Sequence, residues 1–441
     1  MAEPAHSPPS PVPPRPPLHT VLPPLILGTA TFNTQYVPDP QSMPYRAIVA
    51  RSISLGVNAF DTSPYYGPSE LLLGDALDAV MRPSPSDSSS TTSPNAVARK
   101  DLFLITKAGR IASTSFDYTP SWVRYSVLRS LQRLHTAYLD LVYMHDVEFV
   151  SAGEVLAAVR ELRRLRDEEG LIRYVGISGF PPAVLCELAE MIRKETGEGL
   201  DAVLSYGHFT VQNRRLGLPF IEQRGPEVDV EKVEGSVLRR LKNAGVDVVL
   251  NASMLGMGLL TSKGIPVDPP KEDGKGSPLA VWHPSPPGLR VVCKGLAELA
   301  AKAGERLESV AIRWALAEWA QLAAGQGVGV DVDVPEVGRL KVGATVCGVS
   351  SIAELEETMA EWRGVLSGLT GQGSDEKYGS RREGKVLNFV RKELWPALGS
   401  WLDYVWESPG PDFVNARKES ERGVVPDDGV VAAYEKVKQS R

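Results

Sequence analysis

A regular alternation of short apolar runs with longer amphipathic stretches constrains the fold of this chain more than any other feature. Runs rich in Val, Ile and Leu are typical of buried strands, and apolar residues at helical spacing are typical of amphipathic helices. Strands that alternate with helices favour a parallel sheet. The predicted strands occupy residues 25–31, 57–60, 102–106, 139–144, 173–178, 202–205, 246–251 and 342–347. The predicted helices occupy residues 46–55, 70–81, 120–134, 152–167, 182–193, 230–243, 289–303, 309–319 and 352–362.

The number of repeats decides between the two common parallel architectures. Eight strand–helix units predict a closed (β/α)8 TIM barrel, an α/β fold in which both faces of every strand are buried. An open, doubly wound sheet that binds a dinucleotide carries a G-x-G-x-x-G fingerprint at the start of its first helix. No such fingerprint follows residues 25–31, where the sequence reads LILGTAT and then FNTQYV. The sequence therefore favours the barrel.

The chain has 441 residues, whereas a TIM barrel needs about 250, so segments outside the barrel are expected. Residues 1–24 are dominated by proline and predict a disordered, solvated arm, with a polyproline ligand for an SH3 or WW domain as the alternative. The barrel is assigned to residues 25–368. Within it, the Ser/Pro-rich segment 83–95 predicts a disordered insertion. Residues 325–338 alternate valine with polar residues and predict either a small hairpin or an exposed insertion.

Two further segments are expected at the carboxyl-terminal end of the barrel strands. Residues 251–287 form a long loop with many prolines and glycines after the seventh predicted strand, which places the loop on this face. Residues 369–441 form a C-terminal extension. It contains Trp395, Trp401 and Trp406, and such large aromatic side chains usually pack against other residues. We therefore expect the extension to cover the barrel mouth.

Composition and charge exclude several classes of protein. The formal net charge is −6, which argues against a nucleic-acid partner. Cys186, Cys293 and Cys347 are far apart and show no CxxC spacing, which excludes a disulfide framework and a Cys-rich metal site and fits a reducing cytoplasm. No stretch is long and apolar enough to span a bilayer, and proline interrupts any signal-like run. We expect a cytoplasmic protein without metal or membrane partners; the oligomeric state stays open, and a monomer is allowed.

Three consecutive predicted strands each end in an ionisable side chain. Asp61 follows the second strand in FDTSPYYG, Lys107 ends the third in LITKAG, and His145 ends the fourth in LVYMHD. Tyr66 lies five residues after Asp61, in the same loop. Taken singly, each residue could serve as a cap, a surface residue or a packing residue. The carboxyl ends of barrel strands meet at one rim, however, and TIM-barrel active sites lie there, so the four residues are the candidate catalytic set.

These four residue types suit proton transfer at a substrate oxygen. Tyrosine alone has a pKa near 10 and is a poor acid or base at neutral pH. A lysine ammonium beside it favours the phenolate and lowers that pKa, and an aspartate keeps the lysine charged and in place. A histidine can orient the substrate oxygen by hydrogen bonding. Together they suit proton transfer at an oxygen while a hydride moves at its carbon.

The motifs FDTSPYYG, LITKAG, YLDLVYMHD, GISGF, ASMLGMGLLTSKG and VCGVSSIAELEET resemble those of the aldo-keto reductases, in order and spacing. The resemblance covers roughly residues 25–366. It implies a barrel with a nicotinamide cofactor extended across its mouth. It also implies that Tyr66 is the general acid/base, that Lys107 tunes its pKa, that Asp61 partners the lysine and that His145 orients the substrate.

Within this family, the stretches VLSYGHF, ASMLGMGLL and VWHPSPPGLR look like the branch of sugar dehydrogenases that act on D-arabinose or L-galactose. The resemblance implies NAD-dependent oxidation of an aldose, a small-molecule sugar substrate, at C1 to its lactone, in a pathway of the ascorbate or erythroascorbate type. Two alternatives stay open: an NAD(P)H-dependent reductase of small aldehydes or pyridoxal, and a non-catalytic regulatory member of the family. The intact catalytic set disfavours the regulatory alternative.

The same resemblance assigns the cofactor contacts, with departures from the family pattern. Many members hold the nicotinamide amide with a Ser-Asn pair and a glutamine, and stack the ring on a tyrosine. Here these positions are Ser178-Gly179, Leu204 and Ala252. Glycines permit close backbone approach to a pyrophosphate, and the N-terminus of a helix attracts phosphate. The candidate cofactor-binding residues are Gly28, Thr29, Ser178, Ser253, Leu255, Gly256, Gly258, Gly348, Ser350, Ser351 and Glu354.

Glu354 underlies the prediction that the cofactor is NAD. Family members that use NADP typically place a basic residue on the last helix, at about the position of Glu354. A carboxylate there repels a 2′-phosphate and can accept a hydrogen bond from a ribose hydroxyl. The alternative is a solvated residue in a first helical turn, where an acidic side chain is favourable anyway. Alternatives also exist for Gly28, which fits a turn, and for Ser351, which fits a helix N-cap.

Overall fold

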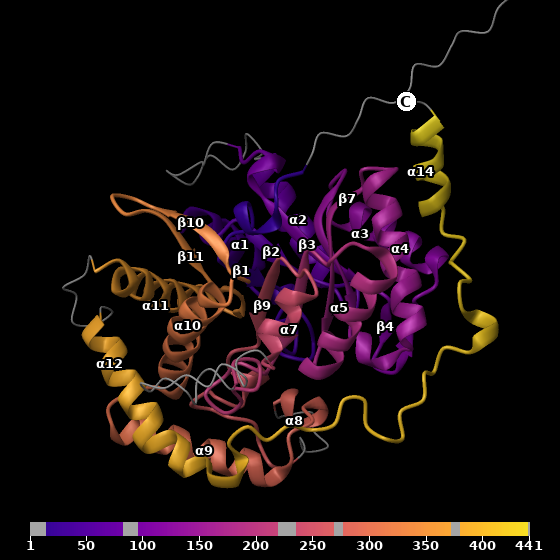
Figure 1. Cartoon of the computed structure of the whole chain (residues 1–441). Coiled ribbons are helices and arrows are strands. Elements are labelled where there is room, and N and C mark those ends of the chain that lie inside the picture. The colour runs from indigo at the N-terminus through magenta and orange to yellow at the C-terminus, as the bar shows by residue number, and fades with distance from the viewer. Residues whose placement is uncertain (1–14, 83–95, 219–234, 269–276, 372–379, 440–441) are drawn as a thin grey trace, which may run out of the picture.

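Eight parallel strands close into a barrel in the computed structural model, which describes residues 15–82, 96–218, 235–268, 277–371 and 380–439 (Figure 1). The strands follow one another around the barrel in the order β1-β12-β9-β8-β7-β6-β3-β2, and β1 pairs with β2 to close it. The predicted (β/α)8 fold is confirmed. The strand bounds are β1 Leu25–Gly28, β2 Ala59–Asp61, β3 Phe103–Ala108, β6 Leu139–His145, β7 Ile172–Gly179, β8 Ala202–Tyr206, β9 Val248–Ala252 and β12 Ala344–Gly348.

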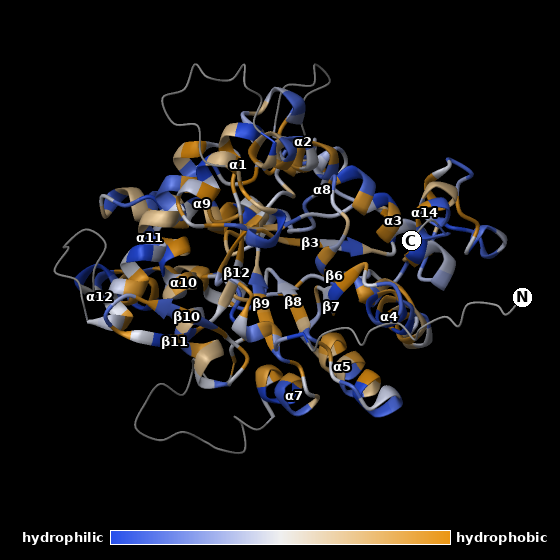
Figure 2. Ribbon diagram, turned by 90° about the horizontal axis from the view of Figure 1, so that it is seen from above, coloured by the Kyte–Doolittle hydropathy of each residue, from blue (hydrophilic) through white to orange (hydrophobic). Residues whose placement is uncertain are grey.

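Helices surround the barrel as a ring, and the view from above shows them enclosing the strands on all sides (Figure 2). Local sequence sets where several of them begin. Ser151 and Glu154 form a reciprocal capping box at the start of α4, and α3, α5 and α9 begin with proline, which lacks the N–H that a first turn leaves unpaired. The helix bounds are α1 Tyr45–Ser54, α2 Ser69–Met81, α3 Pro120–Arg133, α4 Ala152–Asp167, α5 Pro182–Thr196, α7 Val237–Asn243, α9 Pro287–Lys302, α10 Leu307–Gly325 and α11 Ile352–Thr370.

Two small hairpins interrupt the regular repeat. Strands β10 (Val330–Val334) and β11 (Gly338–Val342) pair antiparallel, which decides the open question about residues 325–338 in favour of the hairpin. Strands β4 (Arg110–Ala112) and β5 (Ser115–Phe116) form a second hairpin directly after β3. The sequence does not predict this second hairpin, because strands of two and three residues are too short to show a periodicity.

Other predicted segments lie partly outside the described residues. The insertion predicted at 83–95 lies wholly outside them, and the predicted helix 230–243 is described only as α7. The long loop predicted at 251–287 contains the short helix α8 (Leu279–Trp282). Arg290 holds this loop in place by donating hydrogen bonds to the backbone carbonyls of Pro266, His283 and Ser285.

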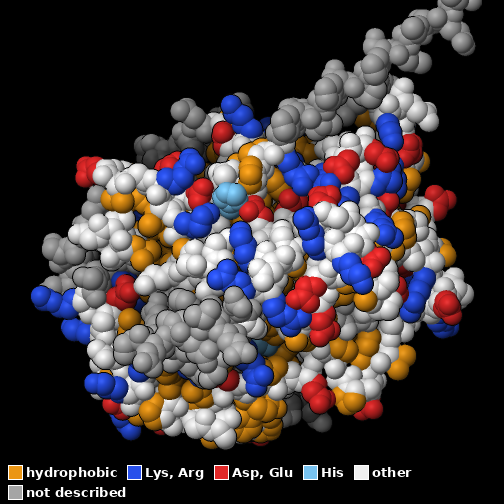
Figure 3. All heavy atoms as spheres, viewed as in Figure 1, with side chains coloured by type: hydrophobic (Ala, Val, Ile, Leu, Met, Phe, Trp, Pro, Cys, Tyr) orange, Lys and Arg blue, Asp and Glu red, His pale blue; other side chains and the backbone are white. Residues whose placement is uncertain are grey.

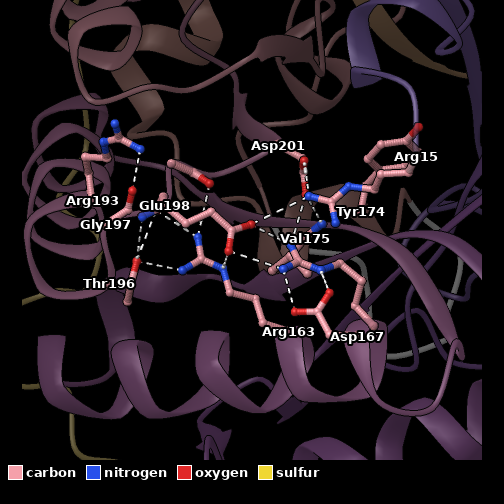
Figure 4. Close-up of polar contacts among 12 residues, drawn as sticks. Arg15, Arg163, Asp167, Tyr174, Val175, Arg193, Thr196, Gly197, Glu198 and Asp201 are labelled. Atoms are coloured by element: carbon pink, nitrogen blue, oxygen red, sulfur yellow. Dashed lines mark hydrogen bonds and ion pairs between the residues drawn. The ribbon is translucent and has the colours of Figure 1, made fainter. Parts of the chain in front are cut away.

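Residues 15–24 correct the predicted boundary of the solvated arm, because this part of the chain packs against the amino-terminal end of the barrel. Leu18 is fully buried, and His19 Nδ1 lies 2.7 Å from Asp247 Oδ1. Arg15 reaches Asp201, 3.1 Å away (Figure 4). Apolar residues spaced between the prolines explain the difference, since burying them favours an ordered path. Residues 1–14 of the predicted arm lie outside the described residues.

The C-terminal extension runs past the loops at the carboxyl ends of the strands (Figure 1). It contains α12 (Ser380–Phe389), a π-helical turn at Val390–Leu394, α13 (Trp395–Leu398) and α14 (Val430–Gln439). The Trp395 indole donates to the Val211 carbonyl, and Asp403 pairs with Arg214 in the loop after β8. Trp406 stacks on Phe180, which directly follows β7, with the ring centroids 5.1 Å apart. The extension thus lies against the loops that follow β7 and β8.

Acidic and basic side chains are intermingled on the face of the molecule drawn in Figure 3, without a large field of one sign. The three cysteines are free thiols and all are buried. Among the described residues, no helix combines the length and apolar character needed to cross a bilayer, and no cluster of three potential metal ligands occurs.

Candidate active site

The pairing of neighbouring strands brings the predicted catalytic residues to one rim. Asp61 is the last residue of β2, and His145 is the last residue of β6. Lys107 lies next to the end of β3 and pairs in register with Tyr143, which precedes His145 by two residues on β6. Residues two apart on a strand point to the same face, so Lys107 and His145 both point into the barrel.

Lys107 and Asp61 form a buried ion pair. Lys107 Nζ donates to Asp61 Oδ1 at 2.6 Å and to the Thr62 carbonyl at 3.0 Å. The two side chains are only 2% and 5% exposed. The predicted partnership of these two residues is present in the structure, and the ammonium group is held at one fixed position below the mouth.

The Tyr66 ring lies between Lys107 and His145. Lys107 Nζ is 4.8 Å from the centroid of the Tyr66 ring, and the His145 ring centroid is 5.6 Å away at an interplanar angle of 88°. Burial raises the pKa of the Tyr66 phenol well above its usual value, and the charges of Asp61 and Asp146 add to this. Burial therefore dominates the pKa of Tyr66 in this structure, and the lowering of that pKa by Lys107 stays a prediction.

His145 is held as a neutral imidazole. Its pKa lies well below the usual value, first because of burial and then because of the positive charges of Lys107 and Arg110. Its Nδ1 is 2.9 Å from Ser63 Oγ, which fixes the ring and leaves Nε2 for another group. The Tyr118 hydroxyl donates to the His145 carbonyl at 2.6 Å and so fixes the end of β6.

Several residues around the site are not predicted from the sequence. Arg110 forms an ion pair with Asp146, donates to the Tyr65 hydroxyl at 3.1 Å and covers the Tyr65 ring, with its guanidinium carbon 3.8 Å from the centroid. Ser63, Tyr65, Arg110 and Asp146 all lie within three residues of a predicted catalytic residue. Their sequence neighbourhood was the available signal, but nothing in a single sequence shows that they contact each other.

Glu148 is a further buried carboxyl group at the mouth. Its Oε1 accepts from the Phe180 N–H at 3.0 Å and from the Ser408 hydroxyl of the C-terminal extension at 3.1 Å. A Cβ atom at Gly179 would lie 2.6 Å from Glu148 Oε2, so a larger residue here would displace the end of the Glu148 side chain. Burial, with the nearby negative charge of Asp146, raises the pKa of Glu148 to about 8.

The candidate cofactor residues at the ends of β1 and β12 lie side by side. Gly28 and Gly348 pair in register. A Cβ at Gly28 would meet the Val346 side chain at 2.9 Å, so close packing between strands explains this glycine. Thr29 is fully buried, donates to the Asp61 carbonyl at 3.0 Å and accepts from Ser69 at 2.7 Å. Any effect of Thr29 on a cofactor is therefore indirect.

The segment after β9 makes a tight turn with unusual backbone angles. Ser253, Gly256 and Gly258 have φ values of 58°, 57° and 106°. The N–H groups of Gly256 and Gly258 donate to the carbonyls of Ser253 and Leu255. The prediction that these two glycines offer free N–H groups to a pyrophosphate is thus corrected, because the turn itself uses them.

Glu354 forms a cap at the start of α11. Its carboxylate accepts from the Ser350 N–H at 2.7 Å and from the Ser350 hydroxyl at 3.0 Å, while its own N–H donates to the Ser351 hydroxyl at 3.2 Å. Ser351 is the N-cap residue, as its alternative role predicts. The carboxylate therefore occupies the N–H-rich helix start where a phosphate would otherwise bind.

The residues at the positions of the family's nicotinamide contacts lie on three neighbouring strands, β7, β8 and β9. Ser178 pairs in register with both His145 and Leu204. Ala252 pairs with Tyr206, whose ring lies 5.3 Å from that of Phe180. Tyr206 on β8 thus lies beside the position at which many family members have a tyrosine.

Comparisons with known proteins show the family of this chain. The model of the aldo/keto reductase family matches residues 24–368. A D-arabinose 1-dehydrogenase from Saccharomyces cerevisiae is 35% identical over 395 residues, which covers 89% of this chain and 96% of that protein. An L-galactose dehydrogenase from Arabidopsis thaliana is 29% identical, covering 80% of this chain and 86% of that protein. The solved glycerol dehydrogenase from Gluconobacter oxydans shares the fold, with a TM-score of 0.50 and 20% identity over 90% of this chain and 97% of its own.

Proposed function

This chain belongs to the aldo/keto reductase family of nicotinamide-dependent oxidoreductases, and we propose that it is an NAD-dependent dehydrogenase that oxidises an aldose at C1 to the lactone. The observation that carries the proposal is the cluster of Asp61, Lys107, Tyr66 and His145 at the mouth of the barrel. The similarity to two sugar dehydrogenases supports an aldose as the substrate. The formation of ascorbate- or erythroascorbate-type compounds is the pathway this chemistry would serve.

The catalytic residues divide the work around the C1 hydroxyl. His145, neutral and fixed by Ser63, would hold the C1 oxygen through Nε2. Tyr66 would take the hydroxyl proton as the C1–H bond breaks, which requires the phenolate. The Lys107 ammonium, 4.8 Å from the ring centroid, stabilises that phenolate by its charge, and Asp61 keeps the ammonium in place. Bound NAD would supply the acceptor for the hydride and a positively charged ring.

The residues present fit a nicotinamide dinucleotide across the mouth. Ser178 would face the carboxamide, Tyr206 beside Ala252 would offer an aromatic surface to the ring, and the serines at the start of α11 would lie near the adenosine. Glu354 fills the helix start with its own carboxylate, so a 2′-phosphate there would meet a like charge. This supports NAD over NADP.

An absorbance assay of NAD reduction tests the proposal. The full-length protein is mixed with NAD and a panel of aldoses that differ at C2, C3 and C4, and the product is identified as a lactone. D-Arabinose and L-galactose are expected among the better substrates. In parallel, NADH and NADPH are offered with small aldehydes and with pyridoxal. Faster turnover of an aldehyde or pyridoxal than of any aldose would favour the reductase alternative, and no turnover at all would favour the regulatory one.

A further inference from the structure

Asp146, which directly follows His145, leaves one buried carboxylate oxygen unpaired at the site. The residue is 1% exposed. Its Oδ2 forms the ion pair with Arg110 and lies 3.7 Å from His145 Nε2. Its Oδ1 has no hydrogen-bond partner among the described residues. A buried carboxylate oxygen without a donor costs free energy, and such an exception in a native protein calls for an explanation.

The backbone and the neighbours of Asp146 hold the carboxylate in this position. Its φ is 58°, in the left-handed region that residues other than glycine enter at a cost. Arg110, which pairs with Oδ2, is itself held by the Tyr65 hydroxyl and ring. Rotation of Asp146 to satisfy Oδ1 would break these contacts. Strain and an unmet hydrogen bond coincide at the residue beside the catalytic histidine, which is typical of functional positions.

The spacing of the two groups matches a vicinal diol. His145 Nε2 would hold the oxygen on the reacting carbon, and Asp146 Oδ2, the oxygen that pairs with Arg110, lies 3.7 Å away, with the unpaired Oδ1 on the same carboxyl group. Hydroxyl groups on adjacent carbons are separated by about one hydrogen-bond length, so one could reach the histidine while its neighbour reaches the aspartate. A carboxylate is a strong, acceptor-only partner, whereas a plain aldehyde has no second hydroxyl to offer.

We propose that Asp146 Oδ1 accepts a hydrogen bond from the 2-hydroxyl of the aldose, which makes Asp146 a specificity-determining residue. This inference rests on the proposed function and names the part of the substrate that the site reads. It predicts that an aldose with a 2-hydroxyl is used roughly ten- to a hundredfold better, in kcat/KM, than the same sugar without it, as for a hydrogen bond to a charged group.

The test is a cycle of two sugars and two proteins. D-Arabinose and 2-deoxy-D-ribose differ only in the 2-hydroxyl, and each is assayed with NAD and with wild-type or Asp146→Asn protein. The preference for D-arabinose over 2-deoxy-D-ribose is expected to shrink clearly in the variant, because the neutral amide is a weaker acceptor for the 2-hydroxyl than the carboxylate. Asp247→Asn, at the opposite end of the barrel beside His19, is the control and should keep the full preference.

The outcomes separate this inference from the proposed function. If the wild type oxidises no aldose, the proposed function fails. If the wild type oxidises D-arabinose but uses 2-deoxy-D-ribose equally well, the inference is overturned without any variant. If Asp146→Asn lowers kcat/KM for both sugars by the same factor, Asp146 merely positions His145, and the inference is again overturned. Should this variant misfold, Asp146→Glu, which keeps the charge but displaces the carboxylate, must also reduce the preference.

Discussion

The two ends of the barrel differ in how completely the oxygens of their carboxylates are paired. At the amino-terminal end, Arg15, Arg163 and Arg166 surround Glu198 and Asp201, and we call these five residues the amino-end cluster (Figure 4). Both oxygens of Glu198 and both of Asp201 lie within 4.0 Å of an arginine nitrogen. At the mouth, one oxygen each of Asp61, Asp146 and Glu148 lacks a hydrogen-bond partner among the described residues.

The pKa values of Glu198 and Glu148 follow this difference, whereas burial raises the pKa of Asp201 despite the charges of Arg15 and Arg166. Burial alone raises the pKa of Glu198, but hydrogen bonds and charges from the three arginines bring it below the usual value. At Glu148 burial and the charge of Asp146 act in the same direction, so the pKa rises to about 8. Glu198 therefore contributes to stability, whereas the mouth keeps buried polar groups that are unfavourable for folding.

The largest expected effect is a loss of turnover at the barrel mouth without a change in the fold. Tyr66→Phe should lower turnover of an aldose by about a hundred- to ten-thousandfold, because the proton-transferring oxygen is lost. The ring remains, so NAD binding, measured by quenching of tryptophan fluorescence, and the melting temperature should hardly change. Tyr45→Phe, whose hydroxyl bonds Asp75 on the barrel surface, is the control. Turnover by Tyr66→Phe within about threefold of wild type would contradict the assignment.

A substitution in the amino-end cluster should instead lower stability and leave turnover unchanged. Asp201→Ala removes the acceptor of the Val175 N–H and of Arg15, and we expect the free energy of unfolding to fall by about 1–3 kcal/mol. Urea denaturation measures this loss. Because the cluster is far from Tyr66, kcat and the aldose KM should stay unchanged. A variant with normal stability but impaired turnover would show that the two ends do not divide their roles as described.

Glu354 differs from the other carboxylates at the mouth. Both of its oxygens accept hydrogen bonds, and in this it resembles the carboxylates at the amino end. We expect wild-type protein to prefer NAD over NADP by roughly tenfold or more in kcat/KM, which corresponds to about 1.4 kcal/mol. Glu354→Arg should narrow or reverse this preference, and Glu356→Arg, on the same helix, should not. Steady-state kinetics with both cofactors at two salt concentrations decide it. Equal use of NADP by the wild type would refute the argument.

The smallest expected effect concerns the pH dependence of stability. The folded protein holds a proton on Glu148 up to about pH 8, whereas the unfolded chain releases it near pH 4.3, so this group lowers stability as pH rises between these values. Glu148→Gln should remove that slope and increase stability at pH 8 relative to the wild type. Glu198 acts oppositely: its stabilisation is present above pH 4.3 and is lost on acidification. Chemical denaturation at pH 5 and pH 8 measures both, and an unchanged slope in Glu148→Gln would contradict this account.

Most of the fold follows from patterns that lie along the chain. The eight apolar runs and the helices between them predict the barrel, because burial on both faces imposes apolar strands whatever the neighbours are. The same logic places Asp61, Lys107 and His145 at one rim. The sequence pattern does not predict short strands such as β4 and β5, because two or three residues are too few to show a periodicity. Leu18 and Leu22 lie in a proline-rich stretch, so the sequence pattern did not predict their burial. Their burial fixes the amino-terminal segment.

The sequence by itself determined the barrel, the family resemblance and the four candidate catalytic residues, since these depend on local pattern and on strand order. Only the tertiary structure decided that burial raises the pKa of Tyr66, that Glu354 caps α11 and that Asp146 keeps one oxygen unpaired. These features depend on how completely water is excluded and on which residues, far apart in the sequence, lie within a few ångströms of each other. Desolvation and hydrogen-bond completion are properties of the packed state, and spacing along a single chain does not contain them.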